Sequence, residues 1–211
     1  GLEKGGMMSV GQSTRWNADK GEAETYEKEN VVTMQLQGGE DYFLAPRLTE
    51  YVVKLTAEIT KAVNAAIGAD GSPILMETHQ TNKLAVCRGD KEGKSAFYLK
   101  HYDNQGGADR RKLTCLYYMN QQWDPKDGGC FRAFSDKDPN GYEDIEPSFD
   151  RFLCFWSDKL VHSVEPYTGL KGRFALTVWL YAADGVEIAR DEEAERVHFP
   201  DFAQKSRDVT G

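Results

Sequence analysis

Short segments rich in β-branched and aromatic residues follow one another along the chain from residue 83 onward. Stretches of Gly, Asp, Asn and Pro separate them, and these residues favour tight turns. The segments span residues 83–89, 96–101, 112–119, 130–134, 151–156 and 173–181. Such a succession of short strands and turns is typical of a β-sandwich or a β-barrel.

A single long helical pattern precedes these segments, over residues 46–67. Apolar side chains recur there at steps of three and four residues, which places them on one face of a helix. They are Leu48, Tyr51, Val52, Leu55, Ile59, Val63 and Ile67. Pro46 suits the first turn of this helix, and Gly68 suits its end. One long helix and many short strands predict a mainly β fold with supporting helices.

The two ends of the chain are polar. Residues 1–30 predict a mobile arm, and a further strand is expected over residues 29–37. Residues 185–211 are strongly charged and predict a short C-terminal helix followed by a disordered tail. A length of 211 residues suits one core, so we expect a single domain over residues 1–211.

The charge balance excludes several classes of partner. The formal net charge is −8, and no stripe rich in Lys or Arg offsets it, which disfavours nucleic-acid binding. No apolar run approaches the roughly 20 residues needed to span a bilayer, and the first residues lack the apolar core of a signal peptide. We therefore expect neither a nucleic-acid nor a membrane partner, and we expect a monomer.

Four cysteines indicate the compartment. Cys87, Cys115, Cys130 and Cys154 each lie in or beside an apolar segment, and none belongs to a CxxC pair. This pattern favours reduced core residues of a protein in the cytoplasm, or in the nucleus, over a pair of disulfides.

The strand expected over residues 96–101 ends at His101, and Asp103 follows two places later. Residues i and i+2 of an extended chain share a face, so both side chains could bind one metal ion. Taken alone the motif is weak, because a solvated strand end gives the same pattern. His162 follows another expected strand and offers a third ligand from a distant part of the chain. Two imidazoles and one carboxylate leave coordination positions open, as in non-haem Fe(II) oxygenases.

The segment over residues 173–181 has one unusual face. This face carries Arg173, Ala175, Thr177 and Trp179, and it alternates with an ordinary apolar face. Burying an Arg costs several kcal/mol unless it is paired, and a substrate carboxylate is a suitable partner. An Arg near solvent at a strand start is the alternative. Tyr118 either places its hydroxyl beside the same carboxylate or is a core aromatic.

Three stretches carry a resemblance to a known family: KHYDNQGGADRRKLTCLYYMNQQWDPKDGGCFRAF, DIEPSFDRFLCFWSDKLVHSVEP and GRFALTVWLY. Over residues 83–183 the chain resembles the prolyl hydroxylase domain family of oxygen-sensing prolyl 4-hydroxylases, which act in hypoxia. The resemblance implies a double-stranded β-helix, also called a jelly roll. It also implies a prolyl 4-hydroxylase of the procollagen-proline type that uses Fe(II), 2-oxoglutarate and O2, with ascorbate as reductant, on a proline of a protein or peptide.

The resemblance also implies roles for individual residues. It places the iron ligands, which are the catalytic residues, on His101, Asp103 and His162. It assigns contacts with 2-oxoglutarate to Arg173, Tyr118, Tyr98 and Thr177, with Arg173 and Tyr118 at the distal carboxylate. It assigns contacts with the substrate to Arg111 and Trp179.

The chain departs from the animal members of this family in the strand before His101. Where those members show Cys-Tyr-Pro, this chain has Cys87, Arg88 and Gly89. In addition, residues 10–35 contain no counterpart of the Arg-Gly-Asp-Lys-like loop that governs substrate choice in the animal enzymes. These departures favour a protist-type member that acts on the small adaptor subunit of SCF-type ubiquitin ligases, rather than on the hypoxia-inducible transcription factor.

Other functions remain open at this point. A 2-oxoglutarate oxygenase that acts on another residue, or on a free amino acid, would use the same ligands. A jelly-roll module that binds a structural metal without turnover is a third interpretation. A zinc hydrolase is disfavoured, because no Glu stands beside the ligands as a general base.

Overall fold

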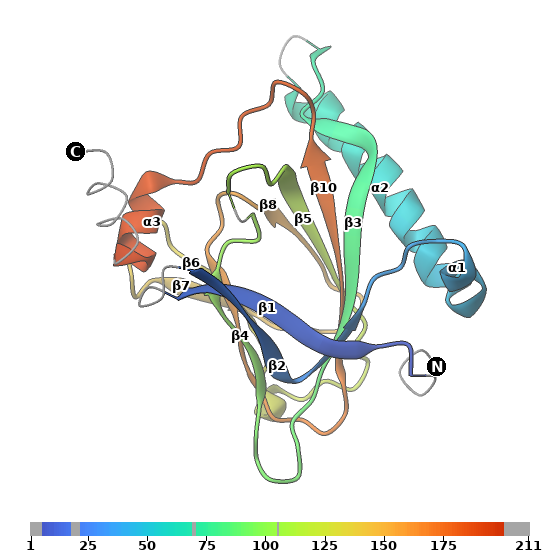
Figure 1. Ribbon diagram of the computed structural model, residues 1–211, viewed down its shortest axis with the longest axis vertical. Helices are drawn as coiled ribbons and strands as arrows, with labels where there is room; N and C mark the ends of the chain where they lie inside the picture. The colour runs from blue at the N-terminus through green and yellow to red at the C-terminus, as the bar shows by residue number, and fades with distance from the viewer. Residues whose placement is uncertain (1–5, 18–21, 69–70, 105, 201–211) are drawn as a thin grey trace.

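The computed structural model describes residues 6–17, 22–68, 71–104 and 106–200, and of residues 13–24 it describes only the backbone. Within these residues, two antiparallel sheets form the body of the protein (Figure 1). The larger sheet has the order β1-β2-β3-β10-β5-β8, with strands Ser9–Asn17, Glu22–Met34, Leu75–Cys87, Arg173–Ala182, Arg111–Tyr118 and Phe152–Trp156. The smaller sheet has the order β4-β9-β6-β7, with strands Ala96–His101, His162–Tyr167, Phe131–Phe134 and Tyr142–Ile145. The predicted mainly β fold with supporting helices is confirmed.

Strand β10 lies inside the larger sheet, between β3 and β5. Its side chains alternate between two environments, as the sequence predicts. Leu176, Val178 and Leu180 belong to the main apolar core, beneath helix α2. The other face of β10 turns towards the smaller sheet and carries the polar residues of the candidate site. Because burial of each Leu or Val contributes about 1.5–3 kcal/mol, the core determines which face of β10 the site receives.

Helix α2 (Pro46–Ile67) packs against β3 and β10, and its bounds agree with the prediction (Figure 1). Val52 and Leu55 are buried against the sheet. Ile67, expected on the same apolar face, is instead 48% exposed at the last position of the helix. A short helix that the sequence analysis does not predict, α1 (Glu40–Leu44), precedes α2.

The prediction of an arm over residues 1–30 is wrong where the structure describes that segment. Strand β1 pairs with β2, and β2 pairs with β3 through Val31 opposite Cys87. The strand expected over residues 29–37 is the end of β2. Charged and polar residues fill both faces of β2 before Val31, so apolar alternation does not reveal the strand. Residues 1–5 and 18–21 of the expected arm lie outside the described residues.

Other strands also differ from the prediction. His162 is the first residue of β9, not a residue trailing the strand that precedes it. The sequences of β9, β7 and the first half of β3 are HSVEPY, YEDI and LMETHQTN. Polar residues or a proline hide these strands from a search for apolar runs, because backbone pairing does not depend on side-chain polarity.

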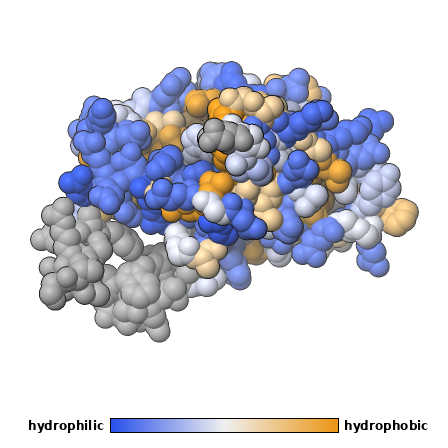
Figure 2. Space-filling view, turned by 90° about the horizontal axis from the view of Figure 1, so that it is seen from above, coloured by the Kyte–Doolittle hydropathy of each residue, from blue (hydrophilic) through white to orange (hydrophobic). Residues whose placement is uncertain are grey.

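At the C-terminus, α3 (Glu192–His198) is the short helix that the sequence predicts, and the Asp191 carboxylate caps it. The expected tail over residues 201–211 lies outside the described residues. No helix in the described part of the chain has the length and hydropathy needed to cross a bilayer. The face seen in Figure 2 is largely hydrophilic, with apolar residues scattered among the polar ones.

Candidate active site

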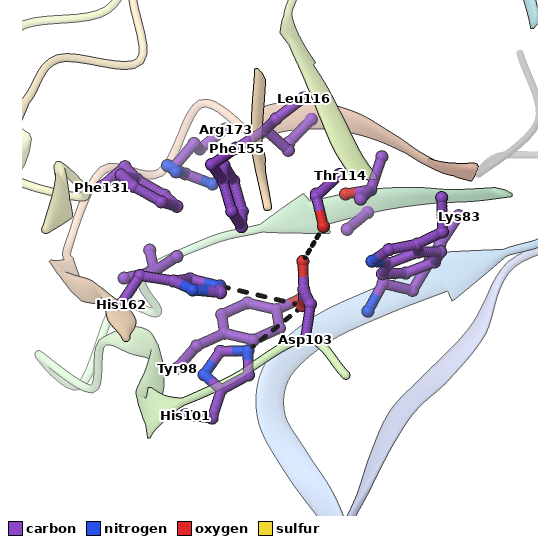
Figure 3. A pocket seen from close by; sticks show the side chains of 15 residues that line it. Lys83, Tyr98, His101, Asp103, Thr114, Leu116, Phe131, Phe155, His162 and Arg173 are labelled. Atoms are coloured by element: carbon purple, nitrogen blue, oxygen red, sulfur yellow. Dashed lines mark hydrogen bonds and ion pairs between the residues drawn. The ribbon is translucent and has the colours of Figure 1, made fainter. Parts of the chain in front are cut away.

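A cavity lies between the two sheets (Figure 3). Strands β3, β5 and β10 of the larger sheet contribute to its wall, and so do β4, β6 and β9 of the smaller sheet. The cavity therefore receives the polar face of β10 and the end of β4, which are the two features that the sequence analysis singles out.

Two imidazoles and a carboxylate meet at this wall. His101 ends β4 and lies opposite His162, which begins β9, while Asp103 follows β4 by two residues. The Oδ1 atom of Asp103 is 3.6 Å from Nε2 of His101 and 3.8 Å from Nε2 of His162. One ligand atom of each residue lies within 4.8 Å of the others. The structure thus brings the three predicted metal ligands together, with spacings that admit an ion at bond lengths of about 2 Å.

Neighbouring groups aim each ligand atom. The Nδ1 atom of His101 lies 2.6 Å from the Leu99 carbonyl oxygen, and that of His162 lies 3.2 Å from the Leu160 carbonyl oxygen. A hydrogen bond donated by Nδ1 leaves the Nε2 lone pair for a metal. The Thr114 hydroxyl donates to Oδ2 of Asp103 at 2.8 Å, which leaves Oδ1 facing the imidazoles.

The protonation states also suit metal binding. Burial lowers the pKa of His162 to about 4, with a further contribution from His101, so the ring is neutral near pH 7. Burial opposes charge on Asp103, but the nearby His162 and His101 outweigh it and hold the pKa of this carboxyl far below its usual range. A neutral imidazole and an ionised carboxylate are the forms that bind a divalent metal.

A buried guanidinium lies at another part of the cavity. Arg173 is 3% exposed, and its Nε donates to the Gly129 carbonyl at 2.7 Å. Its Nη2 lies 3.4 Å from the hydroxyl of Tyr118, which is fully buried. No carboxylate among the side chains that the structure describes forms an ion pair with Arg173. A buried guanidinium without an anion fits a ligand that brings a carboxylate.

Gly129 makes this arrangement possible. It has a φ of +80°, and a Cβ there would lie 2.9 Å from Cδ of Arg173 and 2.8 Å from the ring of Tyr167. Any other residue would therefore push against the arginine stem. Gly128 and Gly129 look like an ordinary turn in the sequence, but Gly129 allows the backbone to approach the Arg173 side chain closely.

The remaining predicted residues lie on the cavity wall or beside it. Tyr98, Thr177 and Trp179 line the cavity. Arg111 is not part of its lining: the Asp109 carboxylate binds its guanidinium at 2.5–3.0 Å, and the guanidinium carbon lies 5.3 Å from the centre of the Trp179 ring. The structure thus places Arg111 beside Trp179, already paired with a carboxylate.

Comparison with known proteins identifies this assembly. Residues 83–181, which contain the triad, Tyr118 and Arg173, match the sequence model of the 2OG-Fe(II) oxygenase superfamily. This part of the chain is a 2OG-Fe(II) oxygenase domain. Its two-sheet fold is the predicted double-stranded β-helix.

Curated relatives of the oxygenase domain are prolyl hydroxylases. The chain is 45% identical over 110 residues to Egl nine homolog 1 of Rattus norvegicus, which covers 50% of this chain and 30% of that protein. It is 43% identical over 97 residues to the prolyl hydroxylase EGLN3 of Homo sapiens, which covers 44% and 38%. The chain thus spans only about a third of the length of these relatives.

A solved structure extends the likeness beyond the matched segment. The prolyl hydroxylase of Trichoplax adhaerens, in complex with a hypoxia inducible factor oxygen degradation domain peptide fragment, superimposes with a TM-score of 0.63 at 27% identity. The match covers 85% of this chain and 73% of that one. The strands before residue 83 therefore belong to the same fold as the oxygenase domain.

The residues of the oxygenase domain fit both groups that the superfamily name implies. The Nε2 and Oδ1 atoms of the triad converge on one point at the cavity wall, which suits Fe(II). Arg173 lines the same cavity, has the Tyr118 hydroxyl 3.4 Å from its Nη2, and forms no ion pair with a described carboxylate, which suits a carboxylate of 2-oxoglutarate.

Cys87 directly precedes Arg88, which replaces the tyrosine of Cys-Tyr-Pro in the animal members. It lies opposite Arg173 in the strand pairing, and its thiol contacts both Arg173 and Tyr98. Arg88 follows the last residue of β3, and since side chains alternate along an extended chain it is not expected on the face that carries Cys87. Cys87 rather than Arg88 therefore stands at the Arg173 end of the site.

Sequence reasoning missed several side chains of the site. Thr114 orients Asp103, and Phe131 stacks on His162 with ring centres 4.9 Å apart and an angle of 18°. Lys83 lines the cavity, and Lys28 lies near it on β2. Thr114 and Phe131 are ordinary residues of expected strands, and Lys28 lies in the segment interpreted as an arm. Only the pairing of β2 with β3 could have revealed the lysines.

Proposed function

We propose that this chain is an Fe(II)- and 2-oxoglutarate-dependent dioxygenase that 4-hydroxylates a proline of a protein or peptide, as oxygen-sensing prolyl hydroxylases do. The observation that carries the proposal is that the triad and the buried Arg173, which has the Tyr118 hydroxyl beside it, line a single cavity. A structural metal site would need no buried guanidinium beside it.

The residues of the chain have separate roles in this proposal. His101, Asp103 and His162 would hold Fe(II) and would leave coordination positions free for 2-oxoglutarate and O2. Arg173 and Tyr118 bind the distal carboxylate of 2-oxoglutarate and fix its orientation. When bound, Fe(II) with 2-oxoglutarate and O2 supplies the oxidising chemistry that hydroxylates C4 of proline, with ascorbate as reductant.

The apolar part of the wall protects this chemistry. Phe131 and Phe155 lie against the His162 ring, each with its ring centre 4.9 Å away. They exclude water from one side of the metal site, and they restrict the imidazole to one orientation. Trp179 and Tyr98 border the space that a prolyl ring would enter.

For the substrate protein we propose the small adaptor subunit of SCF-type ubiquitin ligases. Support comes from the Cys87-Arg88-Gly89 departure and from the missing animal-type loop. The hypoxia-inducible factor is a second candidate, because the Trichoplax relative binds a peptide from the oxygen degradation domain of that protein. We further propose a cytoplasmic or nuclear location, which four free thiols support.

One experiment tests these proposals together. The enzyme is incubated with Fe(II), 2-oxoglutarate and a prolyl peptide from each candidate protein, and mass spectrometry locates any added oxygen on proline. Asp103→Ala is the matched control, because it removes one ligand. Hydroxyproline in one peptide identifies the substrate class. If 2-oxoglutarate is consumed while a free amino acid or a different residue is oxidised, the prolyl assignment is wrong.

A further inference from the structure

Two lysines lie together beside the cavity, and the proposed chemistry uses neither. Lys28 of β2 places its Nζ 3.8 Å from the centre of the Tyr98 ring. Lys83 of β3 places its Nζ 5.7 Å from the same ring and 5.2 Å from the Trp179 ring. Both amines therefore rest on aromatic faces at one part of the cavity wall.

Among the described residues, Asp103 acts on both amines from a distance but forms no ion pair with either. Neither forms an ion pair with a side chain that the structure describes. Burial lowers the pKa of Lys28 to about 7, with the charge of Lys83 as the next contribution, and burial also lowers the pKa of Lys83. Cation–π contacts compensate only part of the loss of water around a charged amine. An anion that entered this part of the cavity would compensate the charge of the two amines.

Lys83 lies away from Arg173, whereas Lys28 rests on Tyr98, which the family resemblance assigns to contact with 2-oxoglutarate. Lys83 lies opposite Thr177, and Arg173 lies opposite Cys87, four residues further along β3. Four residues of a strand span about 13 Å. Figure 3 shows Lys83 well away from Arg173, on the other side of Asp103. In the proposed function Arg173 and the metal would take up the two carboxylates of 2-oxoglutarate, which would leave the lysine amines for the substrate.

We propose that Lys28 and Lys83 form a subsite for a carboxylate side chain, and that the enzyme selects prolines with Asp or Glu one or two residues away. The inference rests on the proposed prolyl hydroxylation. A prolyl ring beside the triad shares the cavity with Lys83, and neighbouring Cα atoms are only 3.8 Å apart. A flanking side chain of the substrate therefore reaches the amines.

The selection is confined to positions close to the proline. Lys83 also borders an open groove along β1, β2 and α1, and this groove carries Glu27, Glu40 and Asp41. A substrate acid placed further along this groove would meet like charges, which disfavours it. The structure therefore predicts a preference for one acidic neighbour of proline, and not for acidic peptides in general.

Binding of paired peptides tests the subsite without turnover. The protein is loaded with Mn(II) and 2-oxoglutarate, and fluorescence anisotropy measures the affinity of proline peptides with Glu, or with Gln, next to the proline. We expect the Glu peptide to bind at least about tenfold more tightly to the wild type. Lys28→Gln with Lys83→Gln should abolish this preference, whereas Lys91→Gln, at an exposed turn lysine, should retain it.

A charge swap keeps the result specific. Lys83→Glu should prefer a peptide with Lys in place of the Glu, which a general loss of folding could not produce; thermal melting of each variant checks the fold. Equal affinity of the two peptides for the wild type would overturn the subsite, and so would binding of neither. We expect free acetate, but not chloride at equal ionic strength, to suppress the preference for the Glu peptide over the Gln peptide. If acetate changes binding while neither peptide is preferred, the lysines bind small anions only and the subsite for a substrate side chain is wrong.

Hydroxylation of the same peptides, measured separately with Fe(II), distinguishes this inference from the proposed function. If hydroxyproline forms equally in both peptides, prolyl hydroxylation stands and the subsite is wrong. If the preference in binding holds but no hydroxyproline forms, the carboxylate subsite stands and the assigned reaction is wrong.

Discussion

The two cationic parts of the cavity hold their charges in different ways. Arg173 is fixed in advance by the Gly129 carbonyl and the Tyr118 hydroxyl. Lys28 and Lys83 have only aromatic rings beneath them. A planar guanidinium held in one geometry suits a cosubstrate that is the same in every turnover. Amines on flexible stems, without a partner of their own, suit a side chain that differs from one substrate to another.

Asp103 lies between Arg173 and Lys83 (Figure 3), and loss of a triad residue should have the largest effect. His101→Ala, Asp103→Ala and His162→Ala each remove one of three ligands, so each should abolish Fe(II)-dependent release of succinate from 2-oxoglutarate. Substantial turnover by any of them would exclude the triad.

Thr114→Val provides a graded control for these variants. It removes only the hydroxyl that donates to Asp103 and leaves all three ligands in place. Loss of such a supporting hydrogen bond should weaken metal affinity by about 10- to 100-fold, measured by metal titration. An unchanged affinity would mean that Asp103 needs no orientation by Thr114.

Lys112 and Lys83 allow a comparison of a paired amine with an unpaired one. The Lys112 amine lies 2.8 Å from Asp158, whose side chain is fully buried. Lys112→Met leaves that carboxylate without its cation and should lower the free energy of unfolding by about 3–5 kcal/mol. Lys83→Met removes an amine that has no carboxylate partner, so stability should stay the same or rise. Denaturant unfolding measures both, and equal losses would mean that Lys83 has an anionic partner.

Arg173 supplies the next prediction. Arg173→Ala removes charge-assisted hydrogen bonds worth about 1.5–3 kcal/mol, so the dissociation constant for 2-oxoglutarate should rise by about 10- to 100-fold. Metal affinity should not change, because Arg173 does not contact the triad. Tyr118→Phe removes one neutral hydrogen bond and should cost at most about tenfold. Titrations with 2-oxoglutarate and with metal separate the two effects, and a loss confined to metal affinity would contradict the carboxylate role.

The position of Arg173 could be predicted from the sequence, whereas that of the lysine pair could not. The sequence predicts which face of β10 carries the site, because Leu176, Val178 and Leu180 alternate strictly with the site residues. Once that core is buried, Arg173 must point into the cavity. His101 and Asp103 are likewise readable from their spacing at a strand end. The site for metal and cosubstrate is thus encoded locally.

The lysine pair could not be predicted in this way. Lys28 lies in a strand without apolar alternation, and Lys83 begins a segment whose signal is carried by its later residues. Their proximity depends on the pairing of β2 with β3, which joins parts of the chain more than 50 residues apart. Backbone hydrogen bonds form this ladder, and they leave no pattern in the side chains. The proposed substrate selection is therefore the part that required a structure.

Lys28 gives the smallest expected effect, and it tests whether the lysines are truly unpaired. Its pKa is lowered from 10.5 to about 7 by burial and by Lys83, while Cys87 and Asp103 act weakly in the opposite direction. Between pH 7 and pH 10.5 the unfolded chain therefore binds a proton at this amine that the folded protein lacks. Stability must then rise with pH across this range, and the penalty for the buried charge is fully present only below pH 7.

Lys28→Met removes the pH-dependent contribution of this amine to the free energy of unfolding. The free energy of unfolding of the wild type, measured relative to this variant by denaturant titration, should increase from pH 7 to pH 9.5. Lys91→Met, at an exposed lysine, should run parallel to the wild type and so controls for all other groups that titrate in this range. A constant difference between wild type and Lys28→Met would mean that the amine keeps an ordinary pKa and already has a counter-ion. Lys28 would then be paired, as Arg173 is with Gly129 and Tyr118, and the two parts of the site would not differ in this respect.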